Sequence, residues 1–392
     1  MKSMAQTKAL VTGNEAAAIG VKLSDVRFIS AYPITPQTTI VEKLAEMVAN
    51  EELDARYVEV ESEHSAMTAV FSSELTGVRS YTATSSHGLL YMHEMLHWTA
   101  GMRLPIVVSV VNRAIGPPWN IWADQTDSMN QKDTGWLQVY CESNQEVLDT
   151  IIMGYRIAED RSVKLPLMSM EDAFILSHTS EPVTVPDISQ VRDFLPEFDL
   201  DFTVDFKNPM GYGSYSTPDG PFMELKKDMA DSMNKARAVI EKTYRDFSES
   251  FGRDYAGLTD NYMMEDAEFA LVATGTLAST AKHVVNLLRN EGKKVGLVRV
   301  KFFRPFPSEE IVSSLKGLKG AGVIDRSLAF SDGGSLYSEV SASLYRKADV
   351  PLTGFVAGLG GRDVRVEEFR KMYEMVEEGS EGIRWINTKG GE

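Results

Sequence analysis

Side chains capable of acid–base chemistry and anion binding follow several segments that we expect to be strands. Four clusters stand out: Tyr32–Gln37, Glu61–Ser65, Ser85–Gly88 and Asn112–Arg113. Open α/β sheets bind ligands outside the carboxyl ends of their strands, so a hydroxyl, two carboxylates, an imidazole and a guanidinium can converge on one crevice. Thr35 also suits a helix cap and Arg113 an ion pair, while Glu61 and Glu63 suit a helix first turn. Taken together, the four clusters favour a binding site.

A long loop between two expected strands is placed to cover this site. It runs over residues 115–133 and includes Trp119, Trp122, Asp124 and Asp127. Long loops inside compact domains often carry function. We therefore expect this loop to act as a lid.

The segment His93–His97 matches H-E-x-x-H, in which two imidazoles on one helix face bind zinc and the glutamate acts as general base. The extended form of that motif needs a glycine at position 100 and a histidine at 103, where this chain has Ala100 and Arg103. The same segment is also needed as a packing helix between two core strands. A zinc hydrolase remains an alternative, which stoichiometric zinc lost in His93→Ala would support.

Two glycine-containing turns suggest phosphate or dinucleotide binding only weakly. Thr274–Thr276 links a strand to a helix, and we favour a tight turn there over an anion cap. Gly358–Asp363 has an aspartate where a dinucleotide fingerprint needs its last glycine. The sequence contains neither G-x-x-x-x-G-K-[ST] nor G-x-S-x-G, so a nucleotide phosphate loop and a serine-hydrolase elbow are both absent from it.

The elements that must position the candidate site alternate between short apolar strands and helices. We predict strands at residues 26–31, 56–60, 80–84, 105–111, 137–141 and 165–170. The first helix after a strand should have Thr35 as its N-cap and Pro36 in its first turn, and a second should run over residues 62–75. Continuous apolar strands separated by helices predict a parallel sheet covered on both faces.

The remainder of the chain predicts a connecting arm and a second α/β unit. Residues 181–222 contain six prolines and few periodic segments, which indicates an ordered arm long enough to reach a neighbour. A charged helix with one apolar stripe follows over residues 222–251, and strands and helices alternate again from residue 267. We predict three parts: residues 1–180, 181–264 and 265–392.

Composition excludes several classes of protein. The 392 residues include 40 Lys and Arg against 56 Asp and Glu, a net charge of −16 that disfavours binding to nucleic acid or anionic membranes. The single cysteine, Cys141, excludes internal disulfides and a cysteine-held iron–sulfur cluster or zinc site within this chain. The N-terminus does not resemble a signal peptide, and no apolar run is long enough to span a bilayer. We expect a cytoplasmic protein.

Seven segments in the same order resemble the alpha subunit of 2-oxoacid:ferredoxin oxidoreductases, the pyruvate and 2-oxoisovalerate enzymes. They are residues 32–38 (YPITPQT), 60–67 (VESEHSAM), 82–85 (TATS), 101–107 (GMRLPIV), 133–136 (DTGW), 303–307 (FRPFP) and 358–363 (GLGGRD). The resemblance covers nearly the whole chain. It implies a thiamine-diphosphate-binding (pyrimidine-type) parallel-sheet domain, followed by a transketolase-C-terminal-like α/β domain.

The resemblance also implies a role for each of three site residues. Glu63 matches the glutamate that contacts the aminopyrimidine ring of thiamine diphosphate and so activates the cofactor, which leaves Glu61 structural or solvent-facing. Thr35 matches a hydroxyl that binds cofactor and 2-oxoacid. Arg113 matches the cation that binds the substrate carboxylate, for which a guanidinium suits better than an ammonium. No role is assigned to His64 or His87.

The family resemblance makes this chain half of an active site. A beta subunit would carry the diphosphate and Mg²⁺ site with a G-D-G motif, which is missing from this sequence. An iron–sulfur subunit with [4Fe–4S] clusters, and a further gamma subunit, would pass electrons to ferredoxin while coenzyme A accepts the acyl group. Residues 93–98 and 112–119 look closer to the branched-chain enzymes, which favours 2-oxoisovalerate. Pyruvate as the substrate and a non-catalytic scaffold subunit remain alternatives.

Overall fold

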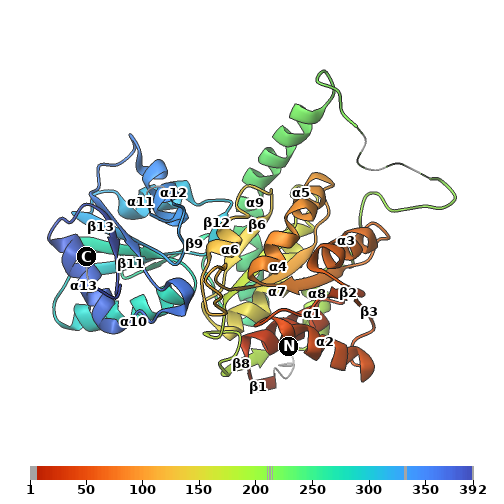
Figure 1. Cartoon of the computed structure of the whole chain (residues 1–392), viewed down its shortest axis with the longest axis horizontal. Helices are drawn as coiled ribbons and strands as arrows, with labels where there is room; N and C mark the ends of the chain where they lie inside the picture. The colour runs from red at the N-terminus through yellow and green to blue at the C-terminus, as the bar shows by residue number, and fades with distance from the viewer. Residues whose placement is uncertain (1–6, 210, 212, 214, 331–332, 391–392) are drawn as a thin grey trace.

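A computed structural model describes residues 7–209, 211, 213, 215–330 and 333–390. The first six residues, part of the segment that does not resemble a signal peptide, lie outside the described residues. Within these limits the strands form three sheets, and the two larger ones lie side by side as separate layered units (Figure 1). The described residues contain no helix long and apolar enough to cross a membrane.

The first unit is built on a seven-stranded sheet in the order β12-β6-β7-β5-β4-β2-β3. Its strands are β2 (Phe28–Ala31), β3 (Arg56–Glu59), β4 (Ser80–Thr84), β5 (Val107–Asn112), β6 (Leu137–Tyr140), β7 (Leu167–Asp172) and β12 (Phe302–Arg304). All neighbours pair in parallel except β12, which returns from later in the chain and pairs antiparallel with β6. The predicted parallel sheet is confirmed.

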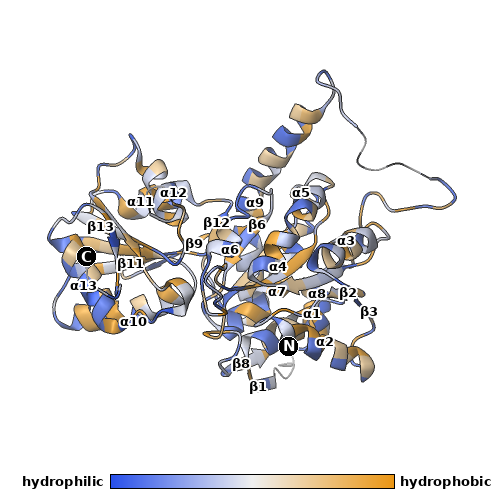
Figure 2. Ribbon diagram, viewed as in Figure 1, coloured by the Kyte–Doolittle hydropathy of each residue, from blue (hydrophilic) through white to orange (hydrophobic). Residues whose placement is uncertain are grey.

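Apolar residues on both faces of the central strands explain why helices cover both sides. On β5, Val107 belongs to one buried cluster and its neighbour Val108 to another, because successive side chains point to opposite faces. One face is covered by α1 (Gly13–Leu23), α2 (Thr38–Ala49) and α7 (Asn144–Ala158), and the other by α3 (Glu63–Glu74), α4 (Ser86–Tyr91) and α5 (His93–Gly101). Figure 2 shows the hydrophobic residues concentrated along these strands.

The predicted N-cap at Thr35 is wrong, because α2 begins only at Thr38. Residues 35–37 form a turn, and the carbonyl groups of its first two residues bind side chains instead of joining the helix. The Thr35 carbonyl accepts a hydrogen bond from Arg113 Nη1 at 2.6 Å, and the Pro36 carbonyl accepts one from Asn14 Nδ2 at 2.7 Å. The turn is therefore held as part of the site, one helical turn ahead of α2.

The second unit is a six-stranded sheet in the order β15-β14-β13-β10-β11-β9. Its strands are β9 (Thr259–Tyr262), β10 (Phe269–Ala273), β11 (Val295–Val300), β13 (Gly320–Asp325), β14 (Leu352–Val356) and β15 (Gly382–Trp385). Buried residues of α10 (Thr276–Asn290) and α13 (Val366–Glu377) belong to one cluster, and those of α11 (Ser308–Leu315) and α12 (Ser335–Leu344) to another. The two clusters mark the two faces of this sheet.

Between the two units the chain forms an arm and a long helix. A small antiparallel sheet pairs β1 (Thr7–Val11) with β8 (Glu181–Val185), and α8 (Ile188–Phe194) follows. Residues 196–204 still lie on the first unit, where the Val204 amide donates to the Leu75 carbonyl at 2.8 Å, and residues 205–209 then extend away from the body. The first turns of α9 (Phe222–Phe251) also project outward (Figure 1). The later turns of α9 bury one apolar stripe that includes Ala236, Ile240 and Phe247. The helix predicted over 222–251 is confirmed.

The two units are joined by a buried carboxylate, Asp172 at the end of β7. It accepts hydrogen bonds from Gln125 Nε2 at 3.0 Å and from the Thr276 amide at 3.0 Å, and it pairs with Arg326 Nη1 at 2.9 Å. Gly275, with φ 56°, makes the turn before α10, as predicted, and a Cβ there would lie 2.9 Å from Asp172 Oδ2. The anion at the start of α10 is therefore the Asp172 carboxylate of this chain.

Glu171, beside Asp172 on β7, predicts a pH-dependent stability. Its side chain is buried, and neither carboxyl oxygen has a hydrogen-bond partner among the described residues. Burial raises the pKa of Glu171 from 4.5 to about 8, with a smaller contribution from the charge of Asp172. The folded chain thus keeps the Glu171 proton to a higher pH than the unfolded chain does. The stability that the neutral carboxyl contributes is therefore lost as the pH rises from about 4.5 to 8.

Glu171→Gln should therefore stabilise the chain at pH 8, by on the order of 4 kcal/mol, and the gain should shrink toward pH 5. Denaturant unfolding of the two proteins at pH 5, 7 and 8 measures the difference. The exposed Glu42→Gln is the control for loss of charge. A pH-independent difference between wild type and Glu171→Gln would contradict the assignment.

Candidate functional site

The candidate site lies at the carboxyl edge of the seven-stranded sheet, where Glu63 begins α3. Ser62 caps this helix, since its Oγ accepts a hydrogen bond from the Ser65 amide at 3.2 Å. Glu63 is only 7% exposed and lies against the start of α4, where a Cβ on Gly88 would fall 2.6 Å from Glu63 Oε1. Glycine at position 88 is what lets this carboxyl group sit against the backbone of α4.

The surroundings of Glu63 shift its acidity in a direction that suits proton transfer. Burial raises the pKa of Glu63 above its usual value, while a hydrogen bond with the backbone and the nearby His87 oppose the shift. Glu61, two residues earlier, is exposed and accepts a hydrogen bond from Ser65 Oγ, which lowers its pKa. The pKa values of the two carboxyls therefore shift in opposite directions, and Glu63 is the one that is more easily protonated.

Arg113 follows β5 and is almost fully buried, at 1% exposure. Its Nη1 donates to the Thr35 carbonyl at 2.6 Å and its Nε to the Asn120 carbonyl at 3.3 Å, whereas Nη2 has no hydrogen-bond partner among the described residues. The ring of Trp119 covers the guanidinium, with its centroid 4.9 Å from Cζ. A buried cation with one unused donor favours an anionic ligand.

The structure brings Thr35 and Arg113 into direct contact and links them to Glu63 through two aromatic rings. Trp119, over Arg113, stacks on His87 with ring centroids 6.2 Å apart, and His87 directly precedes Gly88, which packs against the Glu63 carboxyl group. Thr35 is exposed at the rim of the site. The three predicted site residues therefore surround one region of the sheet edge.

The two histidines without an assigned role occupy different environments. His87 is half-buried, and its Nε2 accepts a hydrogen bond from the Gly116 amide at 3.2 Å, so it supports the loop that carries Trp119. His64 lies on the outer side of α3, where Nε2 is 3.6 Å from Glu94 Oε2 and the ring is near Tyr91. His87 thus belongs to the site, and His64 belongs to the surface beside it.

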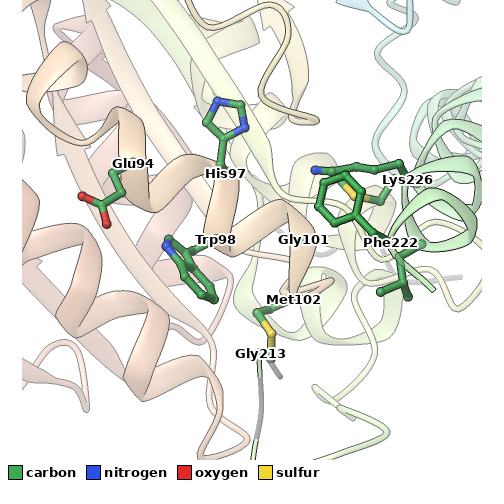
Figure 3. Close-up of a pocket in the computed structure, with 10 residues that line it drawn as sticks. Glu94, His97, Trp98, Gly101, Met102, Gly213, Phe222 and Lys226 are labelled. Atoms are coloured by element: carbon green, nitrogen blue, oxygen red, sulfur yellow. The ribbon is translucent and has the colours of Figure 1, made fainter. Parts of the chain in front are cut away.

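The H-E-x-x-H segment forms helix α5, but its glutamate does not join its histidines. His93 and His97 approach each other at 3.3 Å between Nε2 atoms, and His93 Nδ1 is 2.6 Å from Gln131 Oε1. Glu94 points away from His97 (Figure 3) and faces His64 instead. No group of three or more His, Cys, Asp or Glu residues placed to hold a metal ion occurs in the described part of the chain. This geometry offers no support for the zinc hydrolase.

An apolar pocket of about 590 Å³ lies between α5 and α9 and is lined by Trp98, Met102, Phe222 and Leu225, among others (Figure 3). Neither Thr35, Glu63 nor Arg113 lines it. The chemistry-bearing edge of the sheet is thus separate from this pocket.

The loop over residues 115–133 is bound to the second unit at several points. It contains the short helix α6 (Thr126–Met129), and the Gln125 amide donates to the Arg326 carbonyl at 2.8 Å. Asn120 Nδ2 donates to the Gly360 carbonyl at 3.0 Å, and the Gly360 amide donates to Asp124 Oδ2 at 3.1 Å. The loop that we expected to act as a lid is therefore bonded to the second unit and lies as a wall between the two units.

These contacts also explain the glycines of the 358–363 segment. A Cβ on Gly360 would lie 2.5 Å from Asn120 Nδ2, and one on Gly361 would lie 2.3 Å from Trp122 Cβ. Both glycines have positive φ, 60° and 76°. The glycines let the second unit approach the loop that carries Trp119, a role that the sequence pattern alone does not indicate.

Comparison with protein families agrees with this architecture. Residues 19–245 match the family model described as pyruvate flavodoxin/ferredoxin oxidoreductase, thiamine diphosphate-binding, and residues 267–369 match pyruvate:ferredoxin oxidoreductase core domain II. The pyruvate synthase subunit PorA of Methanothermobacter thermautotrophicus is 45% identical over 97% of this chain and 98% of its own length. The ketoisovalerate oxidoreductase subunit VorA of Pyrococcus horikoshii is 45% identical over the same shares.

Two solved structures share the fold. The 2-oxoglutarate:ferredoxin oxidoreductase of Magnetococcus marinus superposes with a TM-score of 0.70 and 17% identity, over 95% of this chain and 65% of that longer chain. A split-gene transketolase superposes with a TM-score of 0.53 and 10% identity, over 95% of this chain and 98% of that one. At such low identities the likeness concerns the fold alone.

Proposed function

Because this chain belongs to the pyruvate flavodoxin/ferredoxin oxidoreductase family, we propose that it is the alpha subunit of a thiamine-diphosphate-dependent 2-oxoacid:ferredoxin oxidoreductase. The reaction joins a 2-oxoacid and coenzyme A to give acyl-CoA, CO₂, one proton and two electrons, which reduce ferredoxin. The observation that carries the proposal is the joint placement of Glu63 and Arg113 at one sheet edge, with a buried Arg113 Nη2 left unused.

The residues present fit thiamine diphosphate in its pyrimidine-binding half. A buried carboxyl with a raised pKa is the group needed against a ring nitrogen, and Glu63 is that group. The sequence has no G-D-G motif, and the described residues form no cluster of three metal ligands. We assign the Mg²⁺ and diphosphate half of the site to a beta subunit, in which case neither chain alone forms the whole site.

In this assignment, each residue of this chain has a separate task. Thiamine diphosphate, when bound, supplies the nucleophilic carbon that attacks the 2-oxo group and allows CO₂ to leave. Glu63 holds and returns a proton at the pyrimidine ring nitrogen, and the start of α4 keeps its carboxyl group out of water. Arg113 Nη2 binds the substrate carboxylate, and Thr35 lies beside it, anchored to Nη1 through its carbonyl.

The electrons must leave through other chains. Cys141 is buried, burial raises its pKa to about 12, and it is the single cysteine in the sequence. A [4Fe–4S] cluster is usually held by four cysteines. We therefore propose an iron–sulfur subunit, and a further gamma subunit, as partners that carry electrons to ferredoxin.

For the substrate we favour 2-oxoisovalerate, with pyruvate as the alternative. The exposed Trp119 ring lies directly beside the proposed carboxylate site and offers an apolar surface to a branched acyl group. Relatives named for pyruvate and for ketoisovalerate are equally similar to this chain, so the choice rests on this loop. One or two extra carbons in a pocket contribute about 1–3 kcal/mol of selectivity.

The test is viologen reduction by the anaerobically purified complex with coenzyme A and either acid. We expect kcat/KM for 2-oxoisovalerate to exceed that for pyruvate by about tenfold or more, and Trp119→Ala to reduce the ratio while Trp385→Ala does not. A preference for pyruvate would refute the substrate assignment and keep the reaction. No reduction with any 2-oxoacid, in a complex with intact clusters and bound thiamine diphosphate, would favour a scaffold subunit.

A further inference from the structure

A single buried carboxylate, Asp127 in α6, is bonded to both loops that carry the proposed site. Its side chain is fully buried and accepts four hydrogen bonds from N–H groups. Oδ2 accepts from the Ser86 amide at 2.9 Å and the Arg113 amide at 3.0 Å. Oδ1 accepts from Asn112 Nδ2 at 2.8 Å and from the Ser128 amide at 2.8 Å.

The Ser86 amide matters because it begins the helix against which Glu63 rests. Ser86 has φ 48°, a backbone conformation in the left-handed region, and it starts α4. Two residues later, Gly88 packs on the Glu63 carboxyl group. A bond that fixes the Ser86 amide therefore fixes the surface that buries Glu63.

The Arg113 amide matters because fixing it fixes the backbone from which the Arg113 side chain extends. The loop at Arg113 is bound again at Ala114, whose carbonyl accepts from Ser86 Oγ at 2.6 Å. Asp127 and this hydroxyl are thus two separate links between the same two loops. Of the two, only Asp127 also ties them to the wall formed by residues 115–133.

We propose that Asp127 is a positioning residue that holds the loops of Glu63 and Arg113 in register, so that proton transfer and carboxylate binding serve one substrate. Asp127 touches neither cofactor nor substrate and acts through the two backbone amides. The inference rests on the proposed function for its catalytic consequence, but the structural part stands on the hydrogen bonds alone.

Asp127→Asn tests the proposal because asparagine has the size of aspartate but replaces one of its two acceptor oxygens with an NH₂ donor. Both carboxylate oxygens accept two N–H donors each, so either orientation of an amide places its NH₂ group against two donors. Asp124→Asn is the matched control, since Asp124 is a buried carboxylate in the same loop whose partners are the Thr126 and Gly360 amides.

The experiment compares wild type, Asp127→Asn and Asp124→Asn in the purified complex by hydrogen–deuterium exchange and by kinetics. In Asp127→Asn we expect the Ser86 and Arg113 amides to exchange about tenfold faster or more, with kcat lowered and the KM for the 2-oxoacid raised together. The Asp124→Asn complex should leave both amides protected. Unchanged exchange at both amides, or a loss of turnover without any change in exchange, would overturn the proposal.

If Asp127→Asn does not fold, Ser86→Ala decides the question by removing the hydrogen bond from the Ser86 hydroxyl to the Ala114 carbonyl. Retained protection at positions 86 and 113 in that variant supports Asp127 as the holding group, whereas lost protection assigns the role to the Ser86 hydroxyl and overturns the proposal. Failure of the proposed function is separate. It would appear as a wild-type complex that turns over no 2-oxoacid, and the exchange comparison would still be valid.

Discussion

Glu63→Gln should lower kcat for 2-oxoacid oxidation by about 10²–10⁴-fold, the range typical of a lost general acid–base group. Glutamine keeps the size of the side chain and its place against Gly88, but it cannot hold and return a proton. Burial raises the pKa of Glu63, so the wild-type carboxyl takes up a proton more easily than an exposed glutamate does. Viologen reduction by the complete complex measures the change, and cofactor content and subunit composition should be unaltered.

Glu61→Gln is the matched control for this experiment. It removes the same charge two residues away, from a side chain that is exposed and bonded to Ser65 rather than buried. We expect its turnover to stay within about twofold of wild type, as for surface substitutions in general. A Glu63→Gln complex that retains wild-type turnover would remove Glu63 from the chemistry, and equal losses in both variants would indicate a general charge effect.

Arg113→Lys should raise the KM for the 2-oxoacid by about 10–100-fold, because a hydrogen bond to a charged group contributes about 1.5–3 kcal/mol. A lysine has a single nitrogen, which cannot occupy the separate positions from which Nε, Nη1 and Nη2 bind the Asn120 carbonyl, the Thr35 carbonyl and the substrate. We expect a smaller effect on kcat. Initial rates over a range of substrate concentrations separate the two constants.

Arg156→Lys serves as the control, since Arg156 pairs with Asp246 on α9 away from the site. It should leave both kinetic constants close to wild type. A fall in kcat with an unchanged KM in Arg113→Lys would show that Arg113 acts on the reacting atoms or the loop rather than on the substrate carboxylate.

The alternation of strands and helices was predictable from the sequence because burial on both faces imposes a simple pattern. Strand β4 falls at the predicted residues 80–84, and α9 at the predicted 222–251. The first is a short run rich in β-favouring Tyr and Thr, and the second is a single apolar stripe with a period of 3.6 residues. The position of the site loops at one edge followed from the rule that open α/β sheets bind ligands at the carboxyl ends of their strands.

Features that depend on distant partners were not predictable in this way. Thr35 resembles a helix cap locally, but Arg113 and Asn14 bind the carbonyls of its turn from elsewhere in the fold. The glycines at positions 360 and 361 face Asn120 and Trp122, more than 200 residues away in the chain. Such contacts leave no periodic trace in the sequence.

Asp127 shows the same limit within the site itself. The sequence shows it as one of three aspartates in a long loop, and nothing local separates it from Asp124. The difference lies in their donors: the amides of both site loops for Asp127, and those of Thr126 and Gly360 for Asp124. A buried carboxylate surrounded by N–H groups is the signal, and it requires coordinates to be seen.

The most direct test of the account is a thiamine diphosphate titration with Mg²⁺ by calorimetry, on this chain alone, on the partner that carries the G-D-G motif alone, and on the two together. We predict tight binding, with one cofactor per pair, only when both chains are present, because each holds one half of the site. Tight binding by this chain alone, or no binding by the pair, would contradict the assignment of Glu63 and Arg113 to a shared active site.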